Sequence, residues 1–145
     1  MFKVNMYLDV SVRGIKKTLG WYGYLVEYTD SRGEKHIRED YRMERNVTPN
    51  MAVLMAFIGA LDCLGKASEI IVFTDNAYLR ENFIKNLNTW KENGWMTAHG
   101  EEVRNKGLWE KIIEKTSGHA VTFSKKYHHE YKNKMAAELA KRRMG

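Results

Sequence analysis

Two aspartates at the ends of two predicted strands are the residues of this sequence that could act together, by binding one cation. Asp9 follows a segment, residues 2–8, in which apolar side chains alternate, and Asp75 closely follows the continuous apolar run at residues 70–73. Alternation predicts a half-buried strand, and a continuous β-branched run predicts a strand covered on both faces. Ligands of open α/β sheets bind beyond the carboxyl ends of the strands. If the two strands are neighbours, the two carboxylates repel each other unless a cation or a proton intervenes, so the pair predicts a cation site.

A plainer interpretation fits the same two residues equally well. Asp75 precedes a helix predicted over residues 76–90, and an aspartate in front of a helix is a common N-cap. Asp9 lies before a predicted loop and could be a turn residue. The aspartates alone therefore leave two interpretations open, a cation site and a pair of structural residues.

The elements that would position these aspartates are strands and helices in mixed order. Predicted strands end at Asp9 and Asp75 and cover residues 19–28, 35–42 and 120–124, and predicted helices cover residues 49–64, 76–90, 107–116 and 129–143. Thr48 is placed as the N-cap of the first helix, Pro49 as its first residue and Gly65 as its end. This order predicts a mixed α/β sheet of five strands, a three-stranded antiparallel meander plus two parallel strands, flanked by helices. Its first and fourth strands should lie side by side.

Composition favours a single globular domain over residues 1–145, with 43% hydrophobic residues and 12% aromatic ones. The N-terminal residues lack the pattern of a signal peptide, and no apolar run approaches the ~20 residues of a membrane-spanning helix. The single cysteine, Cys63, cannot form an internal disulfide, which fits a reducing compartment. We therefore expect a soluble, cytoplasmic protein.

The net charge of +6 is concentrated near the C-terminus, where residues 125–143 hold seven basic residues against Glu130 and Glu138. Such a concentration favours a polyanionic partner, nucleic acid above all. The predicted nucleic-acid contacts of this kind are Lys125, Lys126, Lys132 and Lys134, together with Arg13, Lys16 and Lys17 of the first loop. The open alternative is a solvated helix face, because basic residues also suit the C-terminal end of a helix.

Four segments of the sequence carry a resemblance to a known family. They are Tyr7-Leu8-Asp9-Val10-Ser11, Thr74-Asp75-Asn76-Ala77-Tyr78, Trp90-Lys91-Glu92-Asn93-Gly94-Trp95 and Ala137-Glu138-Leu139-Ala140. The most specific stretch, residues 73–109, combines the Thr-Asp pair with Tyr78, the Trp-x-x-x-Gly-Trp pattern, Asn105 and Leu108-Trp109. Along nearly its whole length the chain resembles type 1 ribonuclease H, which implies a ribonuclease H-like fold.

The resemblance implies a metal site of which half is missing. The family cleaves the RNA strand of RNA–DNA hybrids with two Mg²⁺ ions held by four carboxylates. Asp9 and Asp75 match the first and third of these catalytic, metal-binding positions, whereas Val53 and Ala137 fall on the second and fourth and cannot bind a metal. Glu130 could move in as a replacement ligand. The resemblance therefore implies one weakly held Mg²⁺, or none if the protein is inactive.

This sequence matches the family at some of its substrate-contacting positions and departs from it at others. Asn50 falls on a position that reads the minor groove of the hybrid, and Asn105 and Trp90 belong to its substrate-handling region. Asn50 could equally be an ordinary residue near a helix start, and Trp90, with Trp95 and Trp109, could be core packing. Departures from the family's pattern are Val10, Ala77, Glu101, Glu102 and Tyr127, the last in place of a histidine and followed by His128 and His129 as alternative proton carriers.

Taken together, the sequence predicts a nucleic-acid-binding domain, for RNA–DNA hybrid or duplex, with a degraded two-metal site and little or no nuclease activity. One alternative is an active Mg²⁺-dependent ribonuclease H. A second alternative is a scaffold that binds proteins and has kept the fold only, because a fold does not by itself imply a function. The oligomeric state stays open.

Overall fold

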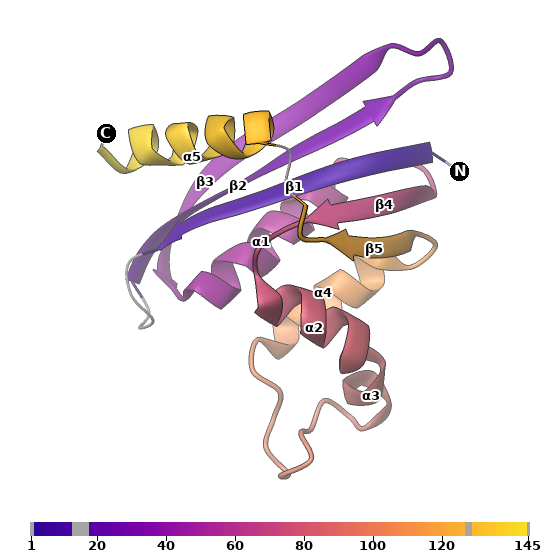
Figure 1. Cartoon of the computed structure of the whole chain (residues 1–145). Helices are drawn as coiled ribbons and strands as arrows, with labels where there is room; N and C mark the ends of the chain where they lie inside the picture. The colour runs from indigo at the N-terminus through magenta and orange to yellow at the C-terminus, as the bar shows by residue number, and fades with distance from the viewer. Residues whose placement is uncertain (1, 13–17, 127–128, 145) are drawn as a thin grey trace.

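The computed structural model describes residues 2–12, 18–126 and 129–144, with His129 described by its backbone alone. Its five strands form one sheet in the order β3-β2-β1-β4-β5 (Figure 1). The strands are β1 Phe2–Val12, β2 Thr18–Thr29, β3 Lys35–Val47, β4 Ser68–Phe73 and β5 Ala120–Ser124. β1, β2 and β3 pair antiparallel, and β4 pairs parallel with both β1 and β5. The predicted mixed sheet, with its first and fourth strands as neighbours, is confirmed.

Helices cover both faces of this sheet, but to different extents. They are α1 Pro49–Leu61, α2 Ala77–Lys85, α3 Leu87–Glu92, α4 Lys106–Thr116 and α5 His129–Met144. α1 packs on one face in the main core, with α2 and α4 beside it, whereas α5 lies on the opposite face over the meander (Figure 1). Side chains of β1 alternate between the two cores, since Met6 and Leu8 belong to the α1 side and Tyr7 to the α5 side. None of the described helices is long and apolar enough to cross a bilayer.

α1 begins as the sequence predicts and lies tightly on the sheet. The Met51 N–H donates to Thr48 Oγ1 at 3.1 Å, so Thr48 is the N-cap. A Cβ at Gly59 would come within 2.7 Å of the Tyr24 ring, which shows how closely helix and strand approach. The predicted end at Gly65 is wrong, because α1 ends at Leu61. The chain then tightens into hydrogen bonds that span three residues instead of four, for example from the Leu64 N–H to the Leu61 carbonyl.

Two further predictions of elements need correction. The helix predicted over residues 76–90 is two helices, α2 and α3, that meet at Asn86. The Asn86 amide donates to Asn82 Oδ1 at 2.8 Å, and asparagine is a weak helix former. β4 is not covered on both faces, since Ile71 is 40% exposed. α5 packs on Tyr7, Leu25 and Tyr41 of the meander strands, and Phe73 of β4 packs partly against this cluster, whereas Ile71 does not belong to it.

Candidate functional site

The two aspartates lie at the same level of two neighbouring strands. The parallel pairing of β1 with β4 ends at Tyr7 opposite Phe73, and each aspartate comes two residues later. Asp9 and Asp75 line one cavity of about 230 Å³. The prediction that the first strand ends at Asp9 is wrong. β1 continues to Val12 and pairs Asp9 with Gly23 of β2.

The interpretation of these aspartates as a cap and a turn residue is wrong. The N-cap of α2 is Asn76, whose Oδ1 accepts the Leu79 N–H at 2.8 Å, so Asp75 is not the capping residue. Asp9 lies inside β1, and its Oδ1 accepts the N–H of the next residue, Val10, at 3.0 Å. Both carboxylates thus line the cavity without serving as a helix cap or a turn residue.

The rest of the cavity provides no third carboxylate. Its other lining residues are Leu8, Val10, Val53, Thr74 and Asn76. Val53 is 2% exposed and places two methyl groups where the resemblance implies a glutamate. Within residues 2–12, 18–126 and 130–144, no other His, Cys, Asp or Glu joins the two aspartates in a cluster with metal-binding spacing. Glu130 is not part of such a cluster in this structure, and its movement into the site stays a prediction. The described lining residues thus include two carboxylates, Asp9 and Asp75, as possible metal ligands.

A lysine of α5, on the other face of the sheet, reaches Asp75. Lys132 Nζ donates to Asp75 Oδ2 at 2.9 Å. The hydrogen bond to Asp75 and the charge of that carboxylate raise the pKa of Lys132. Burial raises the pKa of Asp9, while the Val10 N–H and the positive charge of Lys132 lower it and the charge of Asp75 raises it. Lys132, which the sequence predicts as a nucleic-acid contact, is here the partner of a candidate metal ligand.

A second hollow lies beside the cavity, at the start of α1, and we name it the asparagine hollow. It measures about 740 Å³ and is lined by Thr48, Pro49, Asn50, Met51, Tyr78, Arg104 and Asn105. The structure thus brings together Asn50 and Asn105, two predicted nucleic-acid contacts from distant parts of the sequence. Sequence reasoning missed Arg104 at this place, because nothing in the local pattern distinguishes it from other exposed basic residues.

Tyr78 organises one side of the asparagine hollow. Its hydroxyl oxygen accepts the Asn105 side-chain N–H at 3.2 Å and the Trp109 indole N–H at 3.1 Å. Asn105 has left-handed backbone angles, φ 61° and ψ 28°, which asparagine tolerates better than most residues. The Tyr78 hydroxyl therefore joins the loop before α4 to the start of α2.

The tryptophans of the predicted aromatic frame are mainly packing residues. Trp109 is fully buried, and its ring lies 5.8 Å from the half-buried Trp90 ring at 63°. Trp95 is also half-buried and donates its N–H to the Trp90 carbonyl at 2.8 Å. Trp109 thus supports the asparagine hollow from beneath. A direct contact of Trp90 with nucleic acid stays a prediction.

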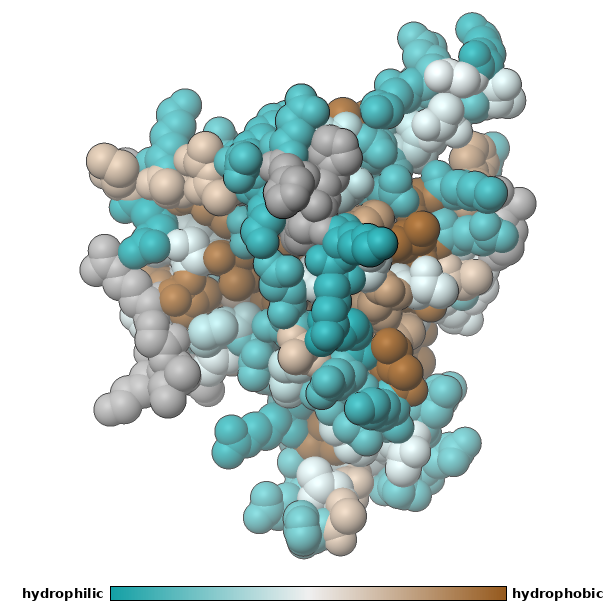
Figure 2. All heavy atoms as spheres, viewed as in Figure 1, coloured by the Kyte–Doolittle hydropathy of each residue, from teal (hydrophilic) through white to brown (hydrophobic). Residues whose placement is uncertain are grey.

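The remaining predicted residues fall into three groups. Lys125, Lys126, Ala77, Ala137 and the Glu101-Glu102 pair are exposed, and Ala137 does not line the cavity. Lys134 donates to Glu39 Oε1 at 2.6 Å, so part of the basic C-terminal charge is used within the molecule. Arg13, Lys16, Lys17, Tyr127, His128 and the side chain of His129 lie outside the described residues. Figure 2 shows hydrophilic side chains over much of the viewed face.

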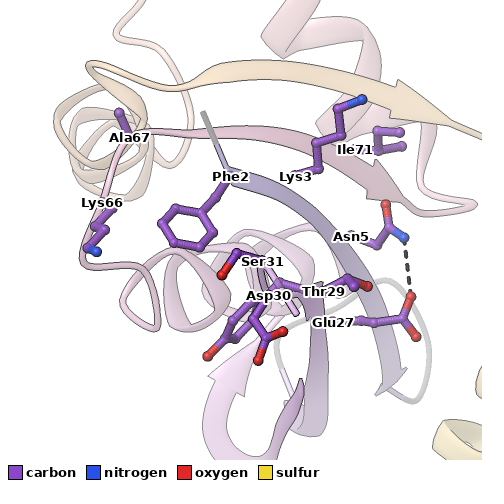
Figure 3. Close-up of a pocket in the computed structure, with 11 residues that line it drawn as sticks. Phe2, Lys3, Asn5, Glu27, Thr29, Asp30, Ser31, Lys66, Ala67 and Ile71 are labelled. Carbon is purple, nitrogen blue, oxygen red and sulfur yellow. Dashed lines mark hydrogen bonds between the residues drawn. The ribbon is translucent and has the colours of Figure 1, made fainter. Parts of the chain in front are cut away.

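A larger hollow lies at the other end of the sheet, and one of its lining residues, Asp30, belongs with Glu34 and His36 to a cluster with metal-binding spacing. This hollow measures about 900 Å³ and lies beside the start of β1 and the β2–β3 turn (Figure 3). Its Glu27 accepts hydrogen bonds from the Asn5 amide, at 3.3 Å, and from the Tyr131 hydroxyl. Lys66 lies over the Phe2 ring, 5.3 Å from its centroid. Glu27 and Lys66 are thus held by neighbours, and because the resemblance points to the aspartates, we place the candidate functional site at the aspartates and the asparagine hollow.

Known proteins of one family are similar to this chain in sequence. The family model of RNase H matches residues 2–144. The ribonuclease H of Lachnoclostridium phytofermentans is 34% identical over 122 residues, which are 83% of this chain and 77% of that protein. The ribonuclease H of Francisella tularensis subsp. novicida is 35% identical over 121 residues, 83% of this chain and 76% of that protein.

Two solved structures show the same arrangement of strands and helices. LC9-RNase H1, described as a type 1 RNase H with the type 2 active-site motif, has a TM-score of 0.72 and 26% identity over 84% of this chain and 61% of that chain. The solution structure of the PFV RNase H domain has a TM-score of 0.65 over 95% of this chain and 92% of that chain. Its 22% identity supports the fold alone.

Proposed function

The chain belongs to the ribonuclease H family, and from this premise we propose that it binds RNA–DNA hybrid or duplex nucleic acid and has little or no nuclease activity. Family membership supports the class of partner. A foamy viral protease-reverse transcriptase that shares the fold was solved in complex with RNA/DNA hybrid, although its 14% identity limits the likeness to the fold. The residues of this chain carry the rest of the proposal.

The observation that carries the binding function is the asparagine hollow. Asn50 and Asn105 each offer an amide that can donate and accept hydrogen bonds, which suits base edges and ribose hydroxyls of a minor groove. Arg104 adds a guanidinium suited to a phosphate. An amide pair with one guanidinium is a recognition set and has no group that could act as a nucleophile.

The proposed lack of activity follows from the donor set at the aspartates. Two-metal hydrolysis needs cations that activate the attacking water and neutralise the leaving oxygen. Asp9 and Asp75 supply two negative charges where the family uses four, and Val53 contributes none. The expected state is at most one weakly held Mg²⁺, at which the family's reaction would be slow or absent.

An active ribonuclease H is the second candidate, and one comparison favours it. Relatives at 34% and 35% identity are named ribonuclease H, and the type 1 fold of LC9-RNase H1 is described with a type 2 active-site motif, so the fold accepts more than one motif. An active enzyme would need a metal ligand beyond Asp9 and Asp75.

The test is a titration of labelled RNA–DNA hybrid with the protein at two salt concentrations, followed by analysis of strand length. With about six phosphate contacts, affinity should fall roughly a thousandfold between 50 and 200 mM salt. The double variant Lys125→Gln with Lys126→Gln should bind more weakly and show a shallower salt dependence, because it removes two exposed positive charges. Absence of binding at the lower salt concentration would contradict the proposal and favour a protein-binding scaffold.

A further inference from the structure

We propose that the ammonium group of Lys132 is a built-in counter-ion for Asp9 and Asp75, so that this end of the sheet holds its two carboxylates together without a divalent cation. This inference rests on the proposed function and deepens it, because it explains how a binding surface of this family can be kept beside a cavity lined by two carboxylates. It assigns to Lys132 a role different from that of the other basic residues of α5.

The geometry places a positive charge on one of the two carboxylates that share the cavity. Lys132 Nζ lies 2.9 Å from Asp75 Oδ2, and Asp75 and Asp9 line the same cavity. The charge of Lys132 also acts on Asp9, in the direction that favours the ionised carboxylate. A single lysine thus offsets repulsion between the two carboxylates, which sequence analysis expected a metal or a proton to relieve.

α5 is fixed on both sides of Lys132. The preceding residue, Tyr131, donates its hydroxyl to Glu27 and packs its ring edge-on to Tyr7, with centroids 5.0 Å apart. Lys134 donates to Glu39, and Met135 is fully buried against the sheet. These contacts set the rotation of α5, so Lys132 is directed toward Asp75 by the packing of its neighbours as well as by its own charge.

The chemistry of the cavity agrees with a lysine better than with a metal. A divalent cation at the two carboxylates would have to displace the ammonium from Asp75 or bear its repulsion at short range. It would find methyl groups at Val53 in place of a further oxygen ligand. Lysine needs only the oxygens that are present, because its ammonium is a compact point charge with three donors.

Lys134 provides a matched control. It lies on the same helix and also forms an ion pair, with Glu39 on β3, and its side chain is 52% exposed against 46% for Lys132. Glu39 does not line the aspartate cavity. Replacing either lysine by glutamine removes one positive charge from α5, but only the change at residue 132 removes charge from the aspartates.

The experiment measures Mn²⁺ binding by electron paramagnetic resonance in the wild type and in Lys132→Gln, Lys132→Arg and Lys134→Gln. Lys132→Gln should bind Mn²⁺ about tenfold more tightly than the wild type, equivalent to about 1.4 kcal/mol. Lys132→Arg, which keeps the charge, and Lys134→Gln should bind as the wild type does. An equal gain in Lys134→Gln would overturn the proposal, as would wild-type binding as tight as that of Lys132→Gln.

A double-mutant cycle with Asp75→Asn measures the coupling between Lys132 and Asp75, so the test does not depend on one variant alone. If Lys132 acts through Asp75, then Lys132→Gln should change Mn²⁺ affinity far less in the Asp75→Asn background than in the wild type. An unchanged effect there would overturn the proposal. Hybrid binding of each protein is measured separately in EDTA. Failure of the wild type to bind hybrid would contradict the proposed function, whereas the Mn²⁺ result would still decide the role of Lys132.

Discussion

The aspartate cavity and the asparagine hollow are both lined by residues of α1, but they differ in the contacts that surround them. Val53 and Asn50 are three residues apart on α1, close to one helical turn, and each lines one of the two sites. The hollow has a polar network around Tyr78 and a buried tryptophan beneath it. The cavity has two carboxylates and a valine, and a lysine from another helix pairs with one of the carboxylates. The surface proposed for recognition of nucleic acid and the candidate metal site are therefore built from different residues.

The two sites also differ in what holds them. The hollow is supported by fully buried aromatic surface, whereas the Lys132–Asp75 pair is exposed, with 46% and 62% of the two side chains accessible. An exposed ion pair contributes about 0–1 kcal/mol to stability. Changes at the hollow should thus affect folding and binding, and changes at the cavity should mainly affect cation binding.

Trp109→Ala should have the largest effect, because it removes the support of the asparagine hollow. Truncation of a fully buried tryptophan costs about 3–5 kcal/mol, and here it also removes a hydrogen bond to Tyr78. Urea unfolding measures the loss. Trp21→Ala is the control, since Trp21 is half-buried against the α5 side of the sheet. A Trp109→Ala protein as stable as the Trp21→Ala protein would show that the hollow is not supported in this way.

Carboxylates placed at Val53 and Ala137, the two positions that the resemblance assigns to metal ligands, should have the next largest effect. Val53→Glu combined with Ala137→Asp should strengthen Mg²⁺ binding and raise hybrid cleavage at least a hundredfold over the wild type, or about 2.7 kcal/mol of barrier. A labelled hybrid measures the cleavage, and Asp75→Asn in the same background should remove it. The expectation fails if the unmodified protein already turns over at roughly 1 s⁻¹ or more and loses that activity on Asp75→Asn.

Asn50→Ala should weaken hybrid binding by about tenfold, or about 1.4 kcal/mol, without a comparable loss of stability. Asn50 lines the hollow and is only partly buried, so the change removes a recognition group and little packing. Fluorescence anisotropy of a labelled hybrid measures the affinity. Asn88→Ala on α3, an exposed asparagine that does not line the hollow, should bind as the wild type does. Equal effects of the two changes would mean that the hollow is not the contact surface.

Sequence reasoning predicted local and strongly patterned features and missed those that depend on distant contacts. Alternation was enough to predict β1, and the Thr48-Pro49 signal was enough to predict the start of α1. The predicted pairing of the first and fourth strands brought Asp9 and Asp75 together at one cavity. The exposure of Ile71 was missed, because it depends on how far α5 extends across the sheet. The pairing of Lys132 with Asp75 was missed for a similar reason, since the rotation of α5 is set by contacts of Tyr131 and Met135.

Asp9→Asn should have the smallest effect, a gain in stability below about 1 kcal/mol in EDTA at neutral pH. Burial holds the pKa of Asp9 above its ordinary value, so the ionised form disfavours folding. The advantage of the variant should therefore be absent below the ordinary aspartate pKa, about 3.9, and develop as the pH rises through the pKa of folded Asp9. Thermal melts at several pH values measure it. A clear loss of stability would mean that the Asp9 carboxylate has a structural role.

The most direct test of the account measures binding and cleavage of RNA–DNA hybrid by the unmodified protein in parallel samples with EDTA, Mg²⁺ or Mn²⁺. If recognition is separate from metal chemistry, and Lys132 neutralises the aspartates, the affinity should be the same in all three samples and both strands should stay intact. Binding that requires the divalent cation, together with rapid cutting of the RNA strand, would contradict the account.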